Sequence, residues 1–106
     1  MTVKEYLKRT IVKHNFDDGF FIQELRPRAV CKDGFSVSIQ ASKCHYCNPR
    51  KDFLKEYDEV ELGFPSEGLN ELADYAEDGD LTETVYGFVP IELVEKLIEK
   101  HGGIVD

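Results

Sequence analysis

The chain has 106 residues and a formal net charge of −8, from 21 acidic and 13 basic residues. This length is typical of one domain that buries a core without obligatory disulfides or metal, so we expect a single compact domain over residues 1–106. An apolar fraction of 42% is that of a globular protein. No stretch reaches the roughly 18 to 20 apolar residues of a membrane helix, and residues 1–8 lack the apolar centre of a secretory signal. We expect a cytoplasmic protein without membrane association, whose three cysteines are reduced.

The charge is divided unevenly along the chain. Residues 1–55 carry 11 Lys or Arg against 6 Asp or Glu, whereas residues 56–106 carry 2 against 15. Counterion release rewards basic surfaces, and phosphates repel acidic ones, so we do not expect direct nucleic-acid binding. A basic protein partner fits this charge better. A solvated acidic surface that keeps the protein soluble is the plainer explanation.

The first 25 residues predict a helix followed by a strand. Thr2 and Glu5 match a capping box, which predicts a helix that begins here and ends near Asn15. Its apolar face would consist of Val3, Leu7, Ile11 and His14. Residues 19–25 are rich in β-forming side chains and predict the first strand.

Residues 28–40 predict a β-hairpin. An Asp-Gly pair at its centre is the preferred two-residue turn, because both central residues need positive φ. This turn pairs Val30 with Val37 and Cys31 with Ser36. Cys31 is then expected on the face of the sheet that points away from the core.

The second half predicts alternating strands and helices. Residues 58–64 alternate with Val60, Leu62 and Phe64 inward, as in a strand with one buried face. The further elements are a helix after Pro65 that buries Leu69, Leu72, Ala73 and Ala76, a strand over 84–89, and a helix from Pro90 that buries Ile91, Val94, Leu97 and Ile98 and ends at His101. The whole predicts an α+β fold in the order α-β-β-β-β-α-β-α. Its mostly antiparallel sheet of four or five strands has about three helices on one face.

The segment ASKCHYCNPR, residues 41–50, has the densest set of reactive side chains. Cys44 and Cys47 have the spacing that lets two thiolates reach one zinc ion, with Cys31 and His45 as candidates to complete the set. A second closely spaced pair is missing, and the predicted hairpin places Cys31 far from the loop. A zinc-binding or thiol-redox protein centred on this cysteine pair therefore stays an alternative.

Signatures of catalysis are absent from the sequence. We find no nucleophile elbow, no phosphate-cradling glycine loop and no His/Glu metal helix pattern. We therefore expect a protein that is not an enzyme, with no catalytic residues and no cofactor.

Recognition of another protein is the remaining interpretation. Tyr and Arg are over-represented among interface anchors, and the segment predicts an exposed basic and aromatic loop formed by His45, Tyr46, Arg50 and Lys51. On the acidic half, the candidate contact residues are Glu59, Glu61, Glu71 and Asp74. Their carboxylates are expected to imitate phosphates toward a basic cleft. Surfaces of opposite sign on one domain also permit self-association, so a structural homo-oligomer is a further alternative.

Three stretches, SIQASKCHYCNPR, VELGFPSEGLNELADYAED and TVYGFVPIELVEKLIEKHGG, resemble small uncharacterised acidic proteins carried by phages and mobile elements of Gram-positive bacteria. That family has no assigned activity, so the resemblance transfers no functional residues. It implies a context in which small acidic proteins bind and inhibit host proteins, including nucleic-acid enzymes and defence complexes.

Overall fold

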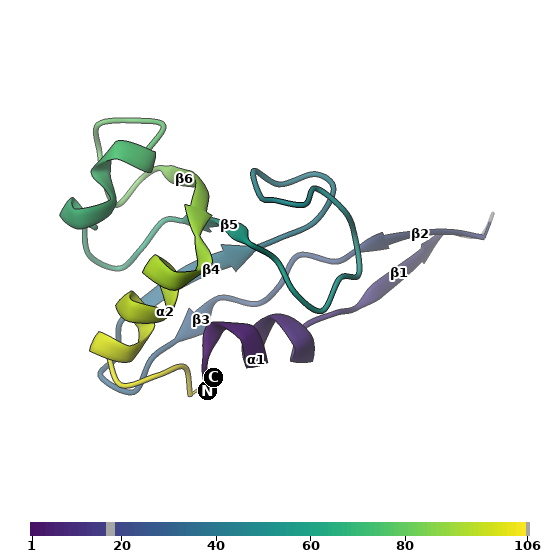
Figure 1. Cartoon of the computed structure of the whole chain (residues 1–106), viewed down its shortest axis with the longest axis horizontal. Coiled ribbons are helices and arrows are strands. Elements are labelled where there is room, and N and C mark those ends of the chain that lie inside the picture. The colour runs from purple at the N-terminus through teal and green to yellow at the C-terminus, as the bar shows by residue number, and fades with distance from the viewer. Residues whose placement is uncertain (17–18, 106) are drawn as a thin grey trace.

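The computed structural model describes residues 1–16 and 19–105. These residues form two α-helices, one 3₁₀ helix and two antiparallel sheets, so the predicted α+β class is confirmed (Figure 1). In chain order the elements are α1 (Val3–Arg9), β1 (Lys13–Phe16), β2 (Phe20–Gln23), β3 (Ala29–Val30), β4 (Ser36–Gln40), β5 (Glu59–Gly63), η1 (Asn70–Tyr75), β6 (Val85–Pro90) and α2 (Ile91–Lys100). None of the described helices has the length and apolar character needed to cross a membrane.

The main sheet has four strands in the order β3-β4-β5-β6, and β1 and β2 form a separate two-stranded ribbon. Buried side chains of α1, α2 and η1 join those of one face of the main sheet in a single hydrophobic cluster. The ribbon and the η1 segment lie at opposite ends of the long axis (Figure 1). The opposite face of the main sheet, which we call the open face, alternates with these buried residues and includes Ser36, Ser38, Glu61, Gly63 and Val85.

The first helix is shorter than predicted. Its capping box is present, but the helix ends at Arg9, and residues 13–16 pair with residues 20–23. The Thr10 hydroxyl donates to the Tyr6 carbonyl at 2.7 Å and satisfies an acceptor at the helix end. Because the strand that follows supplies a ladder of backbone partners, the segment after Thr10 forms β1 although the spacing of Ile11 and His14 fits a helix.

The register of the β3–β4 hairpin is shifted by one residue from the prediction. Val30 pairs with Ser36, and the Cys31 N–H donates to the Phe35 carbonyl at 2.7 Å. The loop has three residues and ends on Gly34 in the left-handed region, at φ 94°, which is a common alternative to the two-residue turn. A shift of one residue moves a side chain to the other face, so Cys31 lies in the core.

The second half follows the predicted pattern with two differences. Val60, Leu62 and the predicted stripe of α2 are buried. The segment after Pro65 forms a 3₁₀ helix with a kink at Leu72, and only part of the predicted face is buried. Phe64 was expected inward but is 48% exposed, because its left-handed backbone, at φ 48°, breaks the alternation of β5.

A buried arginine joins several of these elements. Arg26 is 4% exposed, and its guanidinium donates to the Thr10 hydroxyl at 2.9 Å and to the Ala41 carbonyl at 2.5 Å. The amide side chain of Gln40 bonds both the N–H and the carbonyl of Arg26, each at 2.9 Å. No carboxylate among the described residues forms an ion pair with it. Burial lowers the pKa of the guanidinium, and the Tyr57 hydroxyl opposes that change.

We predict that Arg26→Met lowers the free energy of unfolding by about 2–4 kcal/mol, because it leaves buried acceptors without their charged donor. Urea unfolding followed by circular dichroism measures this. The matched control is Arg28→Met, since Arg28 is exposed, and its loss should stay within about 1 kcal/mol. Equal losses in the two variants would contradict a special role for Arg26.

Candidate binding surface

Residues 41–50 form an irregular loop that docks on β5 and β6. The Phe88 N–H donates to the Tyr46 carbonyl at 2.9 Å, and the Tyr46 N–H donates to the Glu61 carboxylate at 3.1 Å. The Asn48–Pro49 peptide bond is cis. Two hydrogen bonds to Tyr46 therefore fix the middle of the loop on the sheet.

Tyr46 lies on a β-bulge. In the pairing of β5 with β6, two residues of β6, Gly87 and Phe88, lie opposite the single residue Glu61 of β5. A Cβ atom on Gly87 would lie 3.2 Å from the Cβ of Tyr46, so the side chain of Tyr46 packs directly on this glycine. The missing side chain of Gly87 thus makes room for the loop.

Tyr46, Arg50 and Phe88 form what we call the aromatic cluster. The rings of Tyr46 and Phe88 have centroids 5.8 Å apart, and the Arg50 guanidinium lies 5.7 Å from the Tyr46 ring centroid. Tyr46 is 39% and Phe88 43% exposed. Phe88 has φ 53°, a left-handed conformation that costs about 1–2 kcal/mol for a residue with a Cβ. The fold thus holds a large apolar side chain outside the core in a strained backbone.

A groove of about 320 Å³ crosses the open face beside this cluster. Ser38, Gly63 and Val85 are among its lining residues, together with His45 and Phe64. Burial lowers the pKa of His45, so its imidazole is neutral at about pH 7. Apolar and polar side chains both line the groove, and Arg26 and Glu61 are its charged residues.

The hydroxyl of Ser42 lies 2.7 Å from Nδ1 of His45, which is a distance suited to a nucleophile and its base. Ser42 is only 3% exposed, however, and its oxygen also accepts the Cys44 N–H at 3.0 Å. These contacts close a local turn. The Ser42 hydroxyl is thereby engaged in this turn, while Ser42 and His45 both line a hollow of about 500 Å³ beside the β1–β2 ribbon.

The residues proposed from the sequence fall into two places. His45, Tyr46, Arg50 and Glu61 lie together at the docked loop, and the exposed Lys51 follows Arg50. Glu59 is half-buried on the same strand as Glu61. Glu71 and Asp74 are exposed on η1. The four carboxylates therefore do not form one surface, and Glu61 is engaged in holding the loop.

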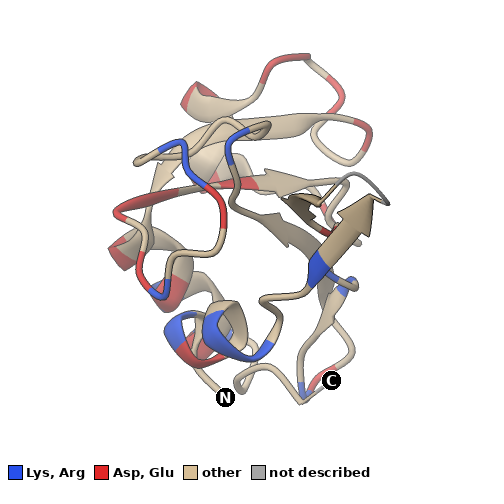
Figure 2. Cartoon of the chain, turned by 90° about the vertical axis from the view of Figure 1, so that its right-hand side faces the viewer, with Lys and Arg blue, Asp and Glu red and all other residues tan. Residues whose placement is uncertain are grey.

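A larger acidic surface surrounds η1. Residues 64–84 contain seven Asp or Glu and no Lys or Arg, and all seven are exposed. We call this stretch the acidic segment. In Figure 2 it lies at the top of the molecule, where the ribbon is coloured red without blue.

The cysteines of the zinc alternative differ in burial and do not share a metal site among the described residues. Cys31 is buried at the edge of the main sheet, where its backbone forms an isolated antiparallel β-bridge with Ile104. Cys47 is also buried, and its Sγ donates to the Ser42 carbonyl at 3.1 Å, whereas Cys44 is exposed. In the part of the chain that the structure describes, no three His, Cys, Asp or Glu side chains are placed to hold a metal ion. Burial raises the pKa of the Cys47 thiol, which disfavours the reactive thiolate of a redox site.

One exposed apolar surface was missed by the sequence reasoning. Phe16, Phe20 and Phe21 of the β1–β2 ribbon are 44%, 54% and 44% exposed, and the Lys43 ammonium lies 4.7 Å from the Phe20 ring centroid. The predicted helix ended near Asn15, so the pairing of residues 13–16 with residues 20–23 was not expected. The Asp-Gly pair that ends at Gly19, followed by an aromatic run, is a sequence signal that indicates a hairpin here.

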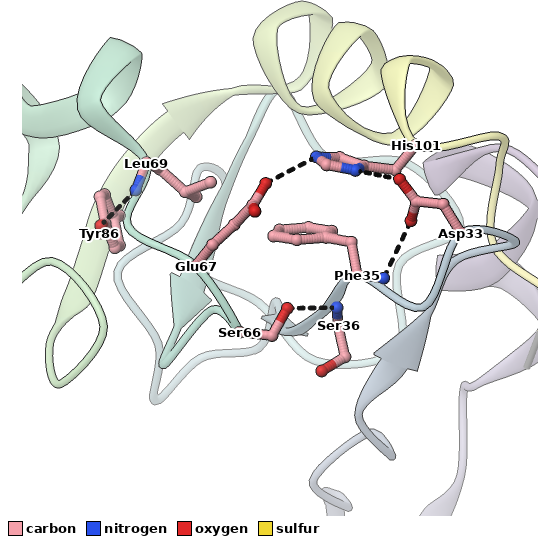
Figure 3. A network of polar contacts seen from close by, with 8 residues as sticks. All are labelled: Asp33, Phe35, Ser36, Ser66, Glu67, Leu69, Tyr86 and His101. Atoms are coloured by element: carbon pink, nitrogen blue, oxygen red, sulfur yellow. Dashed lines mark hydrogen bonds and ion pairs between the residues drawn. The ribbon is translucent and has the colours of Figure 1, made fainter.

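A second polar cluster lies at the C-terminal end of α2 (Figure 3). His101 Nδ1 lies 2.6 Å from the Asp33 carboxylate, and its ring stacks on Phe35 with centroids 4.1 Å apart. The Phe35 N–H and His101 both donate to Asp33, which lowers the pKa of that carboxyl group. The nearby Ser66 hydroxyl accepts a backbone N–H of β4. The cluster therefore contains no Ser–His pair for nucleophilic chemistry.

Protein-family models, curated proteins and solved structures show no match to this chain. Its function is therefore argued from the geometry above.

We predict that iodoacetamide adds to Cys44 in the native protein and leaves Cys31 and Cys47 unmodified, because both are buried and burial raises the pKa of each thiol. Intact-mass measurement should show one adduct in buffer and three in denaturant. Cys44→Ser, as the control, should abolish the native adduct. Modification of Cys47 as fast as Cys44 would contradict this and revive the thiol alternative.

Proposed function

We propose that the protein is a non-enzymatic protein-binding module that contacts its partner through the aromatic cluster. The observation that carries this is Phe88, an exposed phenylalanine in a left-handed conformation beside exposed Tyr46. Burial in the core does not explain its place, whereas strained residues gather at functional sites. Tyr and Arg are frequent anchors at interfaces.

The docked loop favours recognition for a second reason. Hydrogen bonds to Glu61 and Phe88 hold Tyr46 before any partner arrives, so little conformational freedom is lost on binding. The resemblance to phage and mobile-element proteins supports a bacterial host protein in the cytoplasm as the partner.

The test is capture from a lysate of a Gram-positive host, identification of the bound protein, and measurement of its affinity with purified components. We predict that Tyr46→Ser and Arg50→Ser weaken binding at least about 10-fold. Phe88→Gly should do the same while the free energy of unfolding stays equal or rises by up to about 1 kcal/mol, because glycine accepts positive φ.

Phe21→Ser is the matched control for this experiment, since it removes an equally exposed aromatic ring from the β1–β2 ribbon. It should leave the affinity within about 2-fold of the original. Loss of binding in this variant, with binding intact in the Tyr46 and Phe88 variants, would move the contact surface to the ribbon.

The acidic segment favours a second candidate function, inhibition of a nucleic-acid-binding protein by imitation of phosphates. Seven exposed carboxylates without an intervening Lys or Arg produce a field that attracts a basic cleft. This surface contains Glu71 and Asp74 of the sequence-based set, and it excludes Glu59 and Glu61.

For this candidate we predict that reversing Asp74, Glu77 and Glu83 to lysine abolishes competition with nucleic acid for the partner. The three exposed residues Glu56, Glu92 and Glu99 give a control of equal charge change outside the segment. Competition, followed by fluorescence anisotropy, should also weaken steeply as salt rises. Competition that survives the first triple variant would reject phosphate imitation by this segment.

A further inference from the structure

The imidazole of His101 lies between carboxylates that come from two different parts of the chain. Nδ1 lies 2.6 Å from Asp33 in the β3–β4 turn, and Nε2 lies 3.5 Å from Glu67 in the acidic segment (Figure 3). The side chain of His101 is only 8% exposed, whereas those of Asp33 and Glu67 are 51% and 64% exposed. The ring is thus fixed in the fold while both of its carboxylate neighbours reach solvent.

The number of protons on the ring decides whether both contacts are favourable. A neutral imidazole has one N–H and one lone pair, and an ionised carboxylate only accepts hydrogen bonds. If the proton is on Nδ1, facing Asp33, then the lone pair of Nε2 faces the oxygen of Glu67. Nε2 is indeed buried without a hydrogen-bond partner. One added proton gives each nitrogen a donor, so the arrangement is complementary to the imidazolium.

The other groups around the ring act in both directions. Lys32 and Lys100 line the same shallow depression as His101 and Asp33, and their charges oppose protonation. Protonation of the ring is favoured by the two carboxylates, by the carbonyl groups at the end of α2 and by the stacked face of Phe35. The balance therefore depends on Asp33 and Glu67, the groups at the two ring nitrogens.

We propose that His101 is a proton-operated latch for the start of the acidic segment. The imidazolium binds Asp33 and Glu67 together, and loss of a proton from Nε2 to solvent releases Glu67. Residue 66 stays attached in both states, because Ser66 and Ser36 exchange two hydrogen bonds, at 2.8 and 3.0 Å. The movable part is then Glu67 and the residues that lead to Leu69.

The direction with pH follows from which form makes the contacts. In the proposed latch, the contact with Glu67 is favourable while both ring nitrogens carry protons and is lost when one proton leaves, so the latch opens as pH rises. The hydrogen bonds from Phe35 and His101 lower the pKa of Asp33, so that carboxylate stays ionised in the mildly acidic range where the latch is closed.

The test is an NMR titration of the His101 ring between about pH 5.5 and about pH 8.5, with the signal assigned by its loss in His101→Asn. We expect the His101 midpoint to fall by about 0.5 pH unit or more in Glu67→Gln. The exposed Glu77→Gln, the matched control in the same segment, should leave it unchanged. Asp33→Asn should lower the midpoint as well.

Amide hydrogen exchange of residues 67–69 supplies an independent readout. Exchange corrected for its intrinsic pH dependence should be at least about 3-fold slower at the acidic end of the range in the original protein, and this difference should vanish in Glu67→Gln. An unchanged midpoint in Glu67→Gln, or equal corrected exchange at both ends of the range, would overturn the latch.

Discussion

The buried guanidinium of Arg26 is the interaction on which the arrangement of the chain depends. It lies where the end of α1, the end of β4 and the loop before β5 meet, and its donors reach the Thr10 hydroxyl and the Ala41 carbonyl. The ends of helices and strands have backbone groups without hydrogen-bond partners in their own element. A buried charge needs compensation, and here neutral acceptors contact Nε and Nη1, whereas Nη2 is buried without a hydrogen-bond partner. The segment that begins at Ala41 is thereby anchored at its first residue, before it crosses to the sheet.

Anchoring at Ala41 also determines what the loop can present. From this point the chain reaches β6, where the Tyr46 carbonyl accepts the N–H of Phe88. The bulge turns Phe88 outward, and Gly87 leaves space for Tyr46. An exposed aromatic pair on a fixed backbone binds with less loss of conformational entropy than a mobile loop. The fold thus accepts local strain at Phe88 and holds the aromatic pair exposed on a rigid backbone.

Features that depend on local sequence periodicity were predicted correctly, whereas features that depend on pairing between separate strands were not. The stripe of α2 and the alternation of β5 arise from local periodicity, and both were predicted. The spacing of apolar residues after Thr10 fits a helix as well as a strand. Pairing with β2 determines that the segment forms a strand, and such pairing cannot be read from local sequence. An Asp-Gly turn allows loops of two or three residues, so Cys31 was assigned to the wrong face. Tyr46 and Arg50 were found by residue type, whereas Phe88 was missed because a bulge is an irregularity of pairing without a local signal.

The acidic segment must hold like charges close together, because its own sequence contains no Lys or Arg to offset their repulsion. Neutral contacts hold part of it: the Tyr86 hydroxyl donates to the Leu81 carbonyl at 2.5 Å and accepts the Leu69 N–H at 3.4 Å. The cations come from α2, whose Lys96 and Lys100 line a groove with Glu71. His101, at the end of the same helix, is the group that the proposed latch adds to these cations. His101 Nε2 lies 3.5 Å from Glu67, the first carboxylate of the segment, so the proposed latch would couple the helix end to the position of the acidic surface.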